Sequence, residues 1–97
     1  MATLYVVTLK YIKSLEEVDA HIPAHIEWLK QGYADGVFLA SGRQVPRVGG
    51  VILAQCANKE SLIERLQHDP FYKNKLVETV ITAFEPSMCA DALKPLL

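Results

Sequence analysis

Residues 3–12 read TLYVVTLKYI, a segment dense in the β-branched and aromatic residues that favour a β-strand. Apolar side chains occupy both of its faces, with Leu4 and Val6 on one and Tyr5, Val7, Leu9 and Tyr11 on the other. A strand in a two-layer domain of this size buries only one face. The second apolar face therefore predicts a cover from outside the domain, and a second copy of the chain is the simplest candidate.

A helical pattern follows this strand. Ser14 and Glu17 have the spacing of a capping box, which is typical of a helix start. Apolar residues then recur at helical spacing and are expected to face inward: Leu15, Val18, Ile22, Ile26, Leu29 and Tyr33. Pro23 lacks the N–H that a continuous helix needs, so we expect a kink there or a second helix beginning near it.

The rest of the chain repeats these patterns. Strands are predicted over residues 37–41, 50–57 and 77–84. A helix is predicted over residues 59–68, with Asn58 as its N-cap and Leu62, Ile63 and Leu66 facing inward. Asp69 and Pro70 indicate one more helix start. The partly apolar tail, residues 87–97, is expected to pack on something, for which a neighbouring subunit is a candidate.

The resulting order, β-α-β-β-α-β, is that of the ferredoxin-like split unit in the α+β class. It predicts one domain over residues 1–97, with a core over residues 3–86. Four antiparallel strands would carry both helices on one face. The other face would be covered by a second sheet in a homodimer, an arrangement that also encloses cavities for small ligands.

Composition limits the possible partners and compartments. The 97 residues carry a net charge of -1, which argues against nucleic acid, because its binding rests on clustered basic residues. The longest charge-free apolar stretch, residues 48–58, is too short to span a membrane as a helix. The two cysteines lack CxxC spacing, so we expect a reduced, cytoplasmic setting.

Two residues are candidates for proton chemistry. His25 lies at the flank of the apolar stripe of the first helix, where an imidazole could serve as general acid or base, or could simply pack and bond to backbone. Asp69 could orient an imidazole, but its place before Pro70 is fully explained by helix capping. The spacing of the two residues leaves both interpretations open.

Other polar groups are less specific. His21 and His25 are four residues apart, but Pro23 lies between them and no third ligand is evident, so we expect no metal site. We also expect no cofactor. Arg43 and Arg47 flank a predicted hairpin and could together hold an anionic substrate, although arginines in turns are usually solvated.

Four motifs taken together resemble the YciI-like (YCII-related) family of the dimeric α/β barrel superfamily, over residues 5–86. They are residues 23–29 (PAHIEWL), 39–42 (LASG), 46–54 (PRVGGVILA) and 68–71 (HDPF). The resemblance implies a dimer of ferredoxin-like subunits. It also implies a His25–Asp69 dyad in a pocket that Ser41 and Gly42 line.

The chain departs from the family pattern at two positions. Arg43 stands where many members carry proline, and Ile22 replaces an arginine of the first-helix motif, so the anion-binding role could have moved to Arg43. We expect a cofactor-independent enzyme in which His25 and Asp69 isomerise a small anionic or phenolic molecule or eliminate a group from it. The alternatives are a non-catalytic ligand-binding or structural homodimer and, third, a haem-binding protein or oxygenase.

Overall fold

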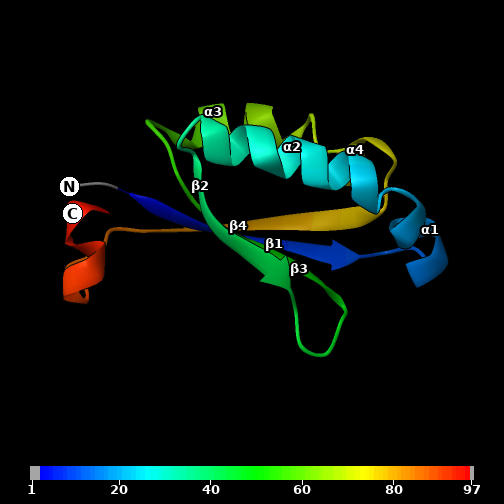
Figure 1. The fold of residues 1–97 in the computed structure, drawn as a ribbon, viewed down its shortest axis with the longest axis horizontal. Coiled ribbons are helices and arrows are strands. Elements are labelled where there is room, and N and C mark those ends of the chain that lie inside the picture. The colour runs from blue at the N-terminus through cyan, green and yellow to red at the C-terminus, as the bar shows by residue number, and fades with distance from the viewer. Residues whose placement is uncertain (1–2, 97) are drawn as a thin grey trace.

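The computed structural model describes residues 3–96, which form a four-stranded antiparallel sheet with helices packed on it (Figure 1). The strands lie in the order β2-β3-β1-β4. They are β1 (Leu4–Tyr11), β2 (Phe38–Arg43), β3 (Gly49–Gln55) and β4 (Val77–Phe84). This α+β, ferredoxin-like arrangement confirms the predicted fold class, and every strand end lies within two residues of its predicted position.

The helices are α1 (Leu15–Ala20), α2 (Ile22–Ala34), α3 (Lys59–Leu66) and the single turn α4 (Pro70–Lys73). Figure 1 shows α2, α3 and α4 together on one face of the sheet, as predicted, and α1 at one end of it. Within residues 3–96, no helix combines the length and the apolar character needed to cross a membrane.

The first predicted helix is two helices. The Ser14 hydroxyl accepts a hydrogen bond from the Glu17 N–H at 3.2 Å, and the Glu17 carboxylate accepts one from the Ser14 N–H at 3.3 Å, which is the predicted capping box. α1 ends at His21 and α2 begins directly after it, with Pro23 in its first turn. Pro23 therefore starts a helix, since its missing N–H has no partner to lose there.

The core lies between the helices and one face of the sheet. Tyr5, Val7 and Leu9 of β1 point into it, and Val7 stands between Ile52 of β3 and Ile81 of β4. Leu62 and Leu66 of α3 and Phe71 of α4 cover these strands. The helices therefore cover the face of β1 that carries Tyr5, Val7 and Leu9.

The predicted inward stripe of the first helical region is wrong in part. Val18 is fully buried, but Leu15, Ile26 and Tyr33 are 46%, 42% and 41% exposed. Ile63 of α3 is also exposed. The break at His21 interrupts the helical register, and part of α2 borders a cavity instead of packing directly on the strands.

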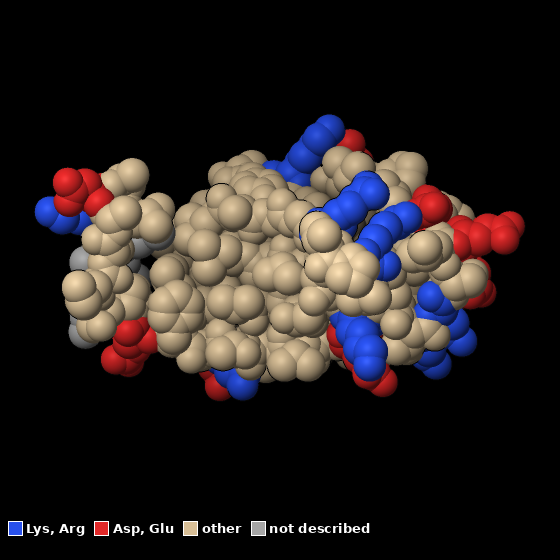
Figure 2. Space-filling model, turned by 90° about the horizontal axis from the view of Figure 1, so that it is seen from below, with Lys and Arg blue, Asp and Glu red and all other residues tan. Residues whose placement is uncertain are grey.

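The other face of the sheet carries apolar side chains with no helix over them. Val6 pairs with Leu53 and Thr82 in adjacent strands, and the next row holds Val51, Thr8 and Val80. Val80 is 58% exposed. Figure 2, which views the molecule from this side, shows no Lys, Arg, Asp or Glu over the middle of the face. We call this surface, formed by Val6, Thr8, Val51, Leu53, Val80 and Thr82, the open face.

The C-terminal segment ends in the 3₁₀ helix η1 (Asp91–Leu96), which lies beyond one end of the sheet (Figure 1). Met88 is 88% exposed and Leu93 is 49% exposed. These apolar side chains do not pack into the chain's own core, so a neighbouring subunit as their partner stays a prediction.

One glycine is required by a close approach between strands. A Cβ atom at Gly49 would overlap the backbone carbonyl oxygen of Leu9, which cannot move without disturbing β1. We expect Gly49→Ala to lower the free energy of unfolding by about 2 kcal/mol or more and the melting temperature by about 10 °C or more. Thermal unfolding followed by circular dichroism measures both.

The next residue offers a matched control. A Cβ atom at Gly50 would lie 3.4 Å from the carbonyl oxygen of Gly42, an ordinary contact. Gly50→Ala should therefore change the free energy of unfolding by no more than about 0.5 kcal/mol. Equal stability of the two variants would contradict the assigned role of Gly49.

Candidate active site

His25 of α2 and Asp69 at the start of α4 meet under the helices although 44 residues separate them. His25 Nδ1 lies 2.7 Å from Asp69 Oδ1. The imidazole is 12% exposed and the carboxylate 1% exposed. The two residues that the resemblance pairs are therefore in hydrogen-bond contact and almost completely shielded from solvent.

The same oxygen of Asp69 also caps α4. Oδ1 accepts a hydrogen bond from the Phe71 N–H at 3.0 Å, as the capping interpretation of Asp69 predicts. The second oxygen, Oδ2, is buried and has no hydrogen-bond partner among the described residues. Capping and contact with the imidazole are thus not alternatives, because one carboxylate oxygen makes both bonds.

Aromatic rings hold the imidazole in place. The Phe71 ring is stacked on the His25 ring, with centroids 3.9 Å apart and planes within 4°. The Trp28 ring lies 5.6 Å from His25, and its indole N–H donates to the Arg65 carbonyl at 3.2 Å. Because Nδ1 is committed to Asp69, Nε2 is the nitrogen left to interact with a ligand.

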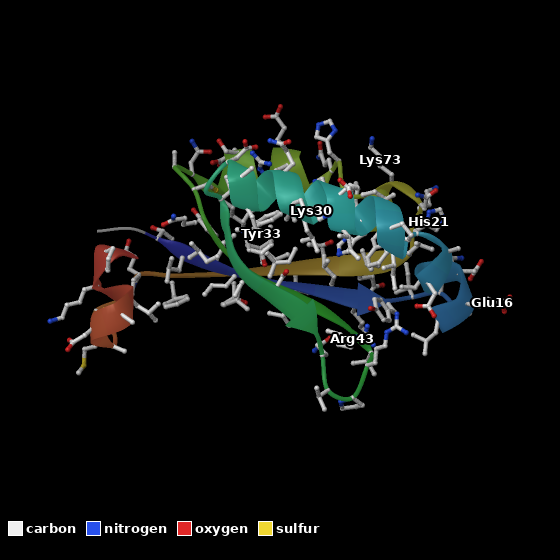
Figure 3. All side chains as sticks on the ribbon, viewed as in Figure 1. Glu16, His21, Lys30, Tyr33, Arg43 and Lys73 are labelled. Carbon is white, nitrogen blue, oxygen red and sulfur yellow. The ribbon has the colours of Figure 1, made fainter. Side chains whose placement is uncertain are left out.

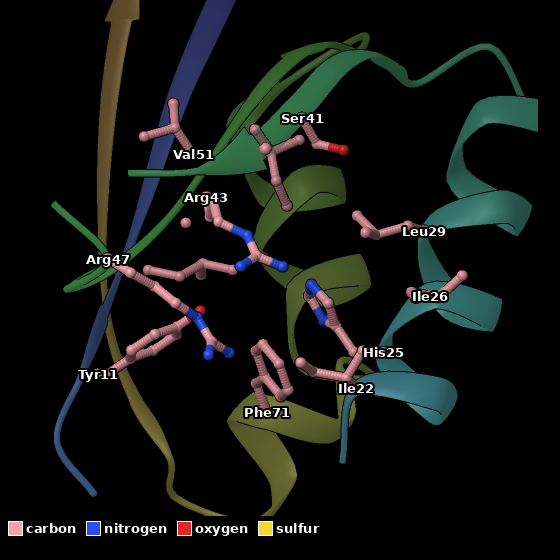
Figure 4. A pocket seen from close by; sticks show the side chains of 14 residues that line it. Tyr11, Ile22, His25, Ile26, Leu29, Ser41, Arg43, Arg47, Val51 and Phe71 are labelled. Atoms are coloured by element: carbon pink, nitrogen blue, oxygen red, sulfur yellow. The ribbon is translucent and has the colours of Figure 1, made fainter. Parts of the chain in front are cut away.

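His25 forms part of the wall of a cavity of about 280 Å³ between α2 and the ends of β1, β2 and β3 (Figure 4). The predicted site residues Ser41, Gly42 and Arg43 line it as well. Most of the remaining wall is apolar and consists of Leu9, Ile22, Ile26, Leu29, Val51, Ile52 and Phe71. The cavity thus combines an apolar body with a few polar groups, as small-molecule sites do.

Ser41 is held by a neighbour across the cavity rim. Its hydroxyl lies 2.6 Å from the hydroxyl of Tyr33, which reaches from α2 toward β2 (Figure 3). The contact fixes the position of β2 relative to α2 at this end of the cavity.

Both arginines of the β2–β3 hairpin line the cavity. Arg47 Nη2 donates to Asp19 of α1, and this hydrogen bond holds the pKa of the Asp19 carboxyl below its usual value. The Arg47 guanidinium lies 5.7 Å from the centre of the Tyr11 ring. Arg43 forms no ion pair with any residue that the structure describes.

The possible metal ligands of this chain are its His, Cys, Asp and Glu side chains. Over residues 3–96, no group of three or more His, Cys, Asp or Glu side chains is arranged to bind a metal ion. His21, the other histidine considered, caps the junction of α1 and α2.

Comparison with known families matches the sequence pattern of the YCII-related domain to residues 3–84. The chain belongs to the YCII-related domain family. The four motifs that carried the resemblance fall within the matched region or at its edges, and the predicted family is confirmed.

Comparison with solved structures finds a similar fold. This YCII-related domain superposes with a TM-score of 0.74 on 5-chloro-2-hydroxyhydroquinone dehydrochlorinase from Burkholderia phenoliruptrix AC1100, which was solved in complex with 2,5-dihydroxybenzoquinone. The identity is 17%, over 84% of this chain and 93% of that chain. Comparison with curated protein sequences finds no match. At this level of identity the superposition establishes the fold.

Both departures from the family pattern lie in the cavity wall. Ile22, which stands where the resemblance implies an arginine, lines the cavity from α2. Arg43, which stands where many members carry proline, lines it from β2 together with Arg47 of the following loop. In this YCII-related domain the positive charge at the cavity therefore comes from the hairpin and not from the helix.

Several residues at the site were not singled out as functional candidates from the sequence. Tyr11 was placed on the same strand face as Tyr5, Val7 and Leu9, and that shared face is the signal that could have placed it near the site. Asp19 gave no signal, since nothing in the chain pairs it with Arg47, 28 residues away. Phe71 occurs in one of the four motifs, but its stacking on His25 was not predicted.

Proposed function

We propose that this YCII-related domain is a cofactor-independent enzyme in which His25 moves a proton to or from a small anionic or phenolic molecule. One observation carries the proposal: the 2.7 Å contact of His25 Nδ1 with buried Asp69, made at the wall of a cavity of about 280 Å³. A carboxylate at one imidazole nitrogen stabilises the protonated ring and leaves the other nitrogen free to act as a base.

The proposed step is an isomerisation or an elimination. Nε2 of His25 takes a proton from a carbon or hydroxyl of the substrate, and the electron pair of that bond forms an enolate or expels a leaving group. Asp69 stabilises the imidazolium that results, and in an isomerisation His25 returns the proton to another atom. General base assistance of this kind accelerates a reaction by about 10²–10⁴-fold.

The remaining cavity residues would bind and orient the substrate. Arg43 offers a positive charge to an anionic oxygen, and Ser41 and Gly42 form the adjacent wall. A cavity of roughly 150 Å³ accommodates benzene, so this one has room for a single substituted ring. The dihydroxybenzoquinone bound by the structural neighbour is a molecule of that kind, which supports the proposed size class.

Proton transfer can be tested without knowing the natural substrate. The protein is incubated in D2O with a panel of small carbon acids and with 5-chloro-2-hydroxyhydroquinone, while deuterium incorporation and chloride release are followed. We expect turnover of at least one compound, and a loss of about 100-fold or more in His25→Asn and in Asp69→Asn. Asparagine at position 25 can still donate to Asp69, and asparagine at position 69 can still cap α4, so both variants should remain folded.

The alternative is a homodimer that binds a small ligand without turnover. It is favoured by the observation that Asp69 also caps α4 and that Phe71 packs on His25, so both dyad residues have a structural use. Under this alternative the wild type turns over no compound of the panel. If His25→Asn instead keeps the full rate of a reaction that the wild type catalyses, His25 does not have the proposed role in proton transfer.

We also propose that two copies of the chain pair through the open face. The proposal is supported by Val80 and its apolar neighbours, which no helix of the described residues covers, since large exposed apolar patches mark interaction sites.

The cytoplasmic setting stays a prediction, in keeping with Cys56 and Cys89, which are both free thiols.

A further inference from the structure

The end of the cavity opposite the helix carries an excess of positive charge. Arg43 and Arg47 both line it, and Figure 4 shows their guanidinium groups turned toward the side on which His25 lies. Of the residues the structure describes, no Asp or Glu lines this cavity. Asp69 lies behind the imidazole, and Asp19 reaches Arg47 from α1.

Arg47 is held in position by its neighbours, but within residues 3–96 not all of its hydrogen-bond donors have an acceptor. Its side chain is 23% exposed, its Nη2 donates to Asp19, and its guanidinium lies near the Tyr11 ring. Its Nε is buried and has no acceptor among the described residues. The described residues therefore satisfy only part of the guanidinium, and the part of Arg47 that lines the cavity can donate to a ligand oxygen.

The charges select the type of anion. The Asp19 carboxylate compensates Arg47, and Arg43 has no such partner in the described part of the chain. One net positive charge at the arginine end balances a single negative charge, whereas a phosphate dianion would leave one charge uncompensated. The planar fork of a guanidinium also matches the two oxygens of a carboxylate.

We infer that Arg43 and Arg47 form a subsite for the carboxylate group of a small monocarboxylic acid, with Asp19 as the residue that positions Arg47. The apolar body of the ligand contacts Ile22, Ile26 and Leu29 of α2. This inference rests on the proposed function for one point, that the reacting atom faces Nε2 of His25. It narrows the substrate from any anionic or phenolic molecule to a carboxylate.

Calorimetric titration with benzoate, neutral benzamide and dianionic phenyl phosphate tests the subsite, because the three probes share a ring and differ in charge. We expect benzoate to bind at least about tenfold more tightly than benzamide, and at least as tightly as phenyl phosphate. Arg43→Gln and Arg47→Gln should each weaken benzoate by about fivefold or more and leave benzamide unchanged. Asp19→Asn leaves two net positive charges at the arginine end, so it should strengthen the binding of phenyl phosphate relative to that of benzoate.

Arg65→Gln is the matched control. Arg65 is an arginine of α3 paired with Asp35 at 2.8 Å, it does not line the cavity, and its replacement should leave all three affinities unchanged. The inference is overturned if benzoate binds no better than benzamide, if phenyl phosphate binds best, or if the two hairpin variants bind benzoate like the wild type. Failure here is distinct from failure of the proposed function, because the exchange assay depends on His25 and this titration depends on the arginines.

Discussion

Asp69→Ala should lower the free energy of unfolding by about 3 kcal/mol, which corresponds to a fall in melting temperature of about 12–24 °C for a chain of this length. Alanine removes the N-cap of α4, a loss of about 1 kcal/mol by itself. It also leaves the His25 Nδ1 without its acceptor in a buried place. This second unsatisfied group adds about 1–3 kcal/mol. Chemical denaturation followed by circular dichroism measures the change.

Asp69→Asn removes the charge of the carboxylate but keeps an oxygen that can accept the same two hydrogen bonds. The asparagine carbonyl oxygen can accept from both Phe71 and His25, so this variant should lose no more than about 1 kcal/mol. The amide then occupies the place of Oδ2, which has no partner in the wild type among the described residues. If the alanine and asparagine variants unfold at the same temperature, the two hydrogen bonds of Oδ1 do not stabilise the fold.

Val80→Asp should convert the proposed dimer to a monomer, with an increase in dissociation constant of about 10³-fold or more. Val80 lies on the open face, across from Thr8 of β1, and an isologous interface contains each substitution twice. Two carboxylates without partners would then be buried in the interface. In the monomer the same side chain is 58% exposed, so the fold itself should tolerate the change. Sedimentation equilibrium over a range of protein concentrations gives the dissociation constant.

Val45→Asp controls for added charge. Val45 lies in the β2–β3 loop, is 95% exposed, and is not part of the open face, so its replacement should leave the dissociation constant unchanged. Circular dichroism confirms that both variants fold. A wild-type protein that sediments as a monomer at every concentration, or an unchanged mass for Val80→Asp, would show that the open face does not pair in this way.

Local rules predicted most of the fold. Ser14, Asn58 and Asp69 were each expected to cap a helix, and each accepts a hydrogen bond from a backbone N–H in the first turn of its helix. These expectations need only neighbours within three residues along the chain. The two-faced pattern of side chains in β1 also depends only on neighbouring residues, because successive side chains of a strand point to opposite faces of the sheet.

Prediction of the site required knowledge of contacts between residues that are far apart in the sequence, which short-range spacing does not provide. Nothing in the separation of His25 and Asp69 indicates contact, and their pairing came from the family resemblance alone. The helical period assigned Ile26 and Tyr33 to the inner side of α2, but it does not give the distance from helix to sheet, so only the family resemblance indicated a pocket here. Ten basic and eleven acidic residues allow too many pairings for the sequence to single out Asp19 with Arg47.

The double use of one carboxylate oxygen of Asp69 affects how relatives of this protein should be compared. A homologue that had lost its chemistry would still need a capping residue before the same proline, so natural selection would retain an aspartate or an equivalent capping residue for the sake of folding alone. Among residues 3–96, no backbone group forms a hydrogen bond with the side chain at position 25. Across an alignment, the histidine is therefore the informative position, and the aspartate without it indicates only a conserved turn.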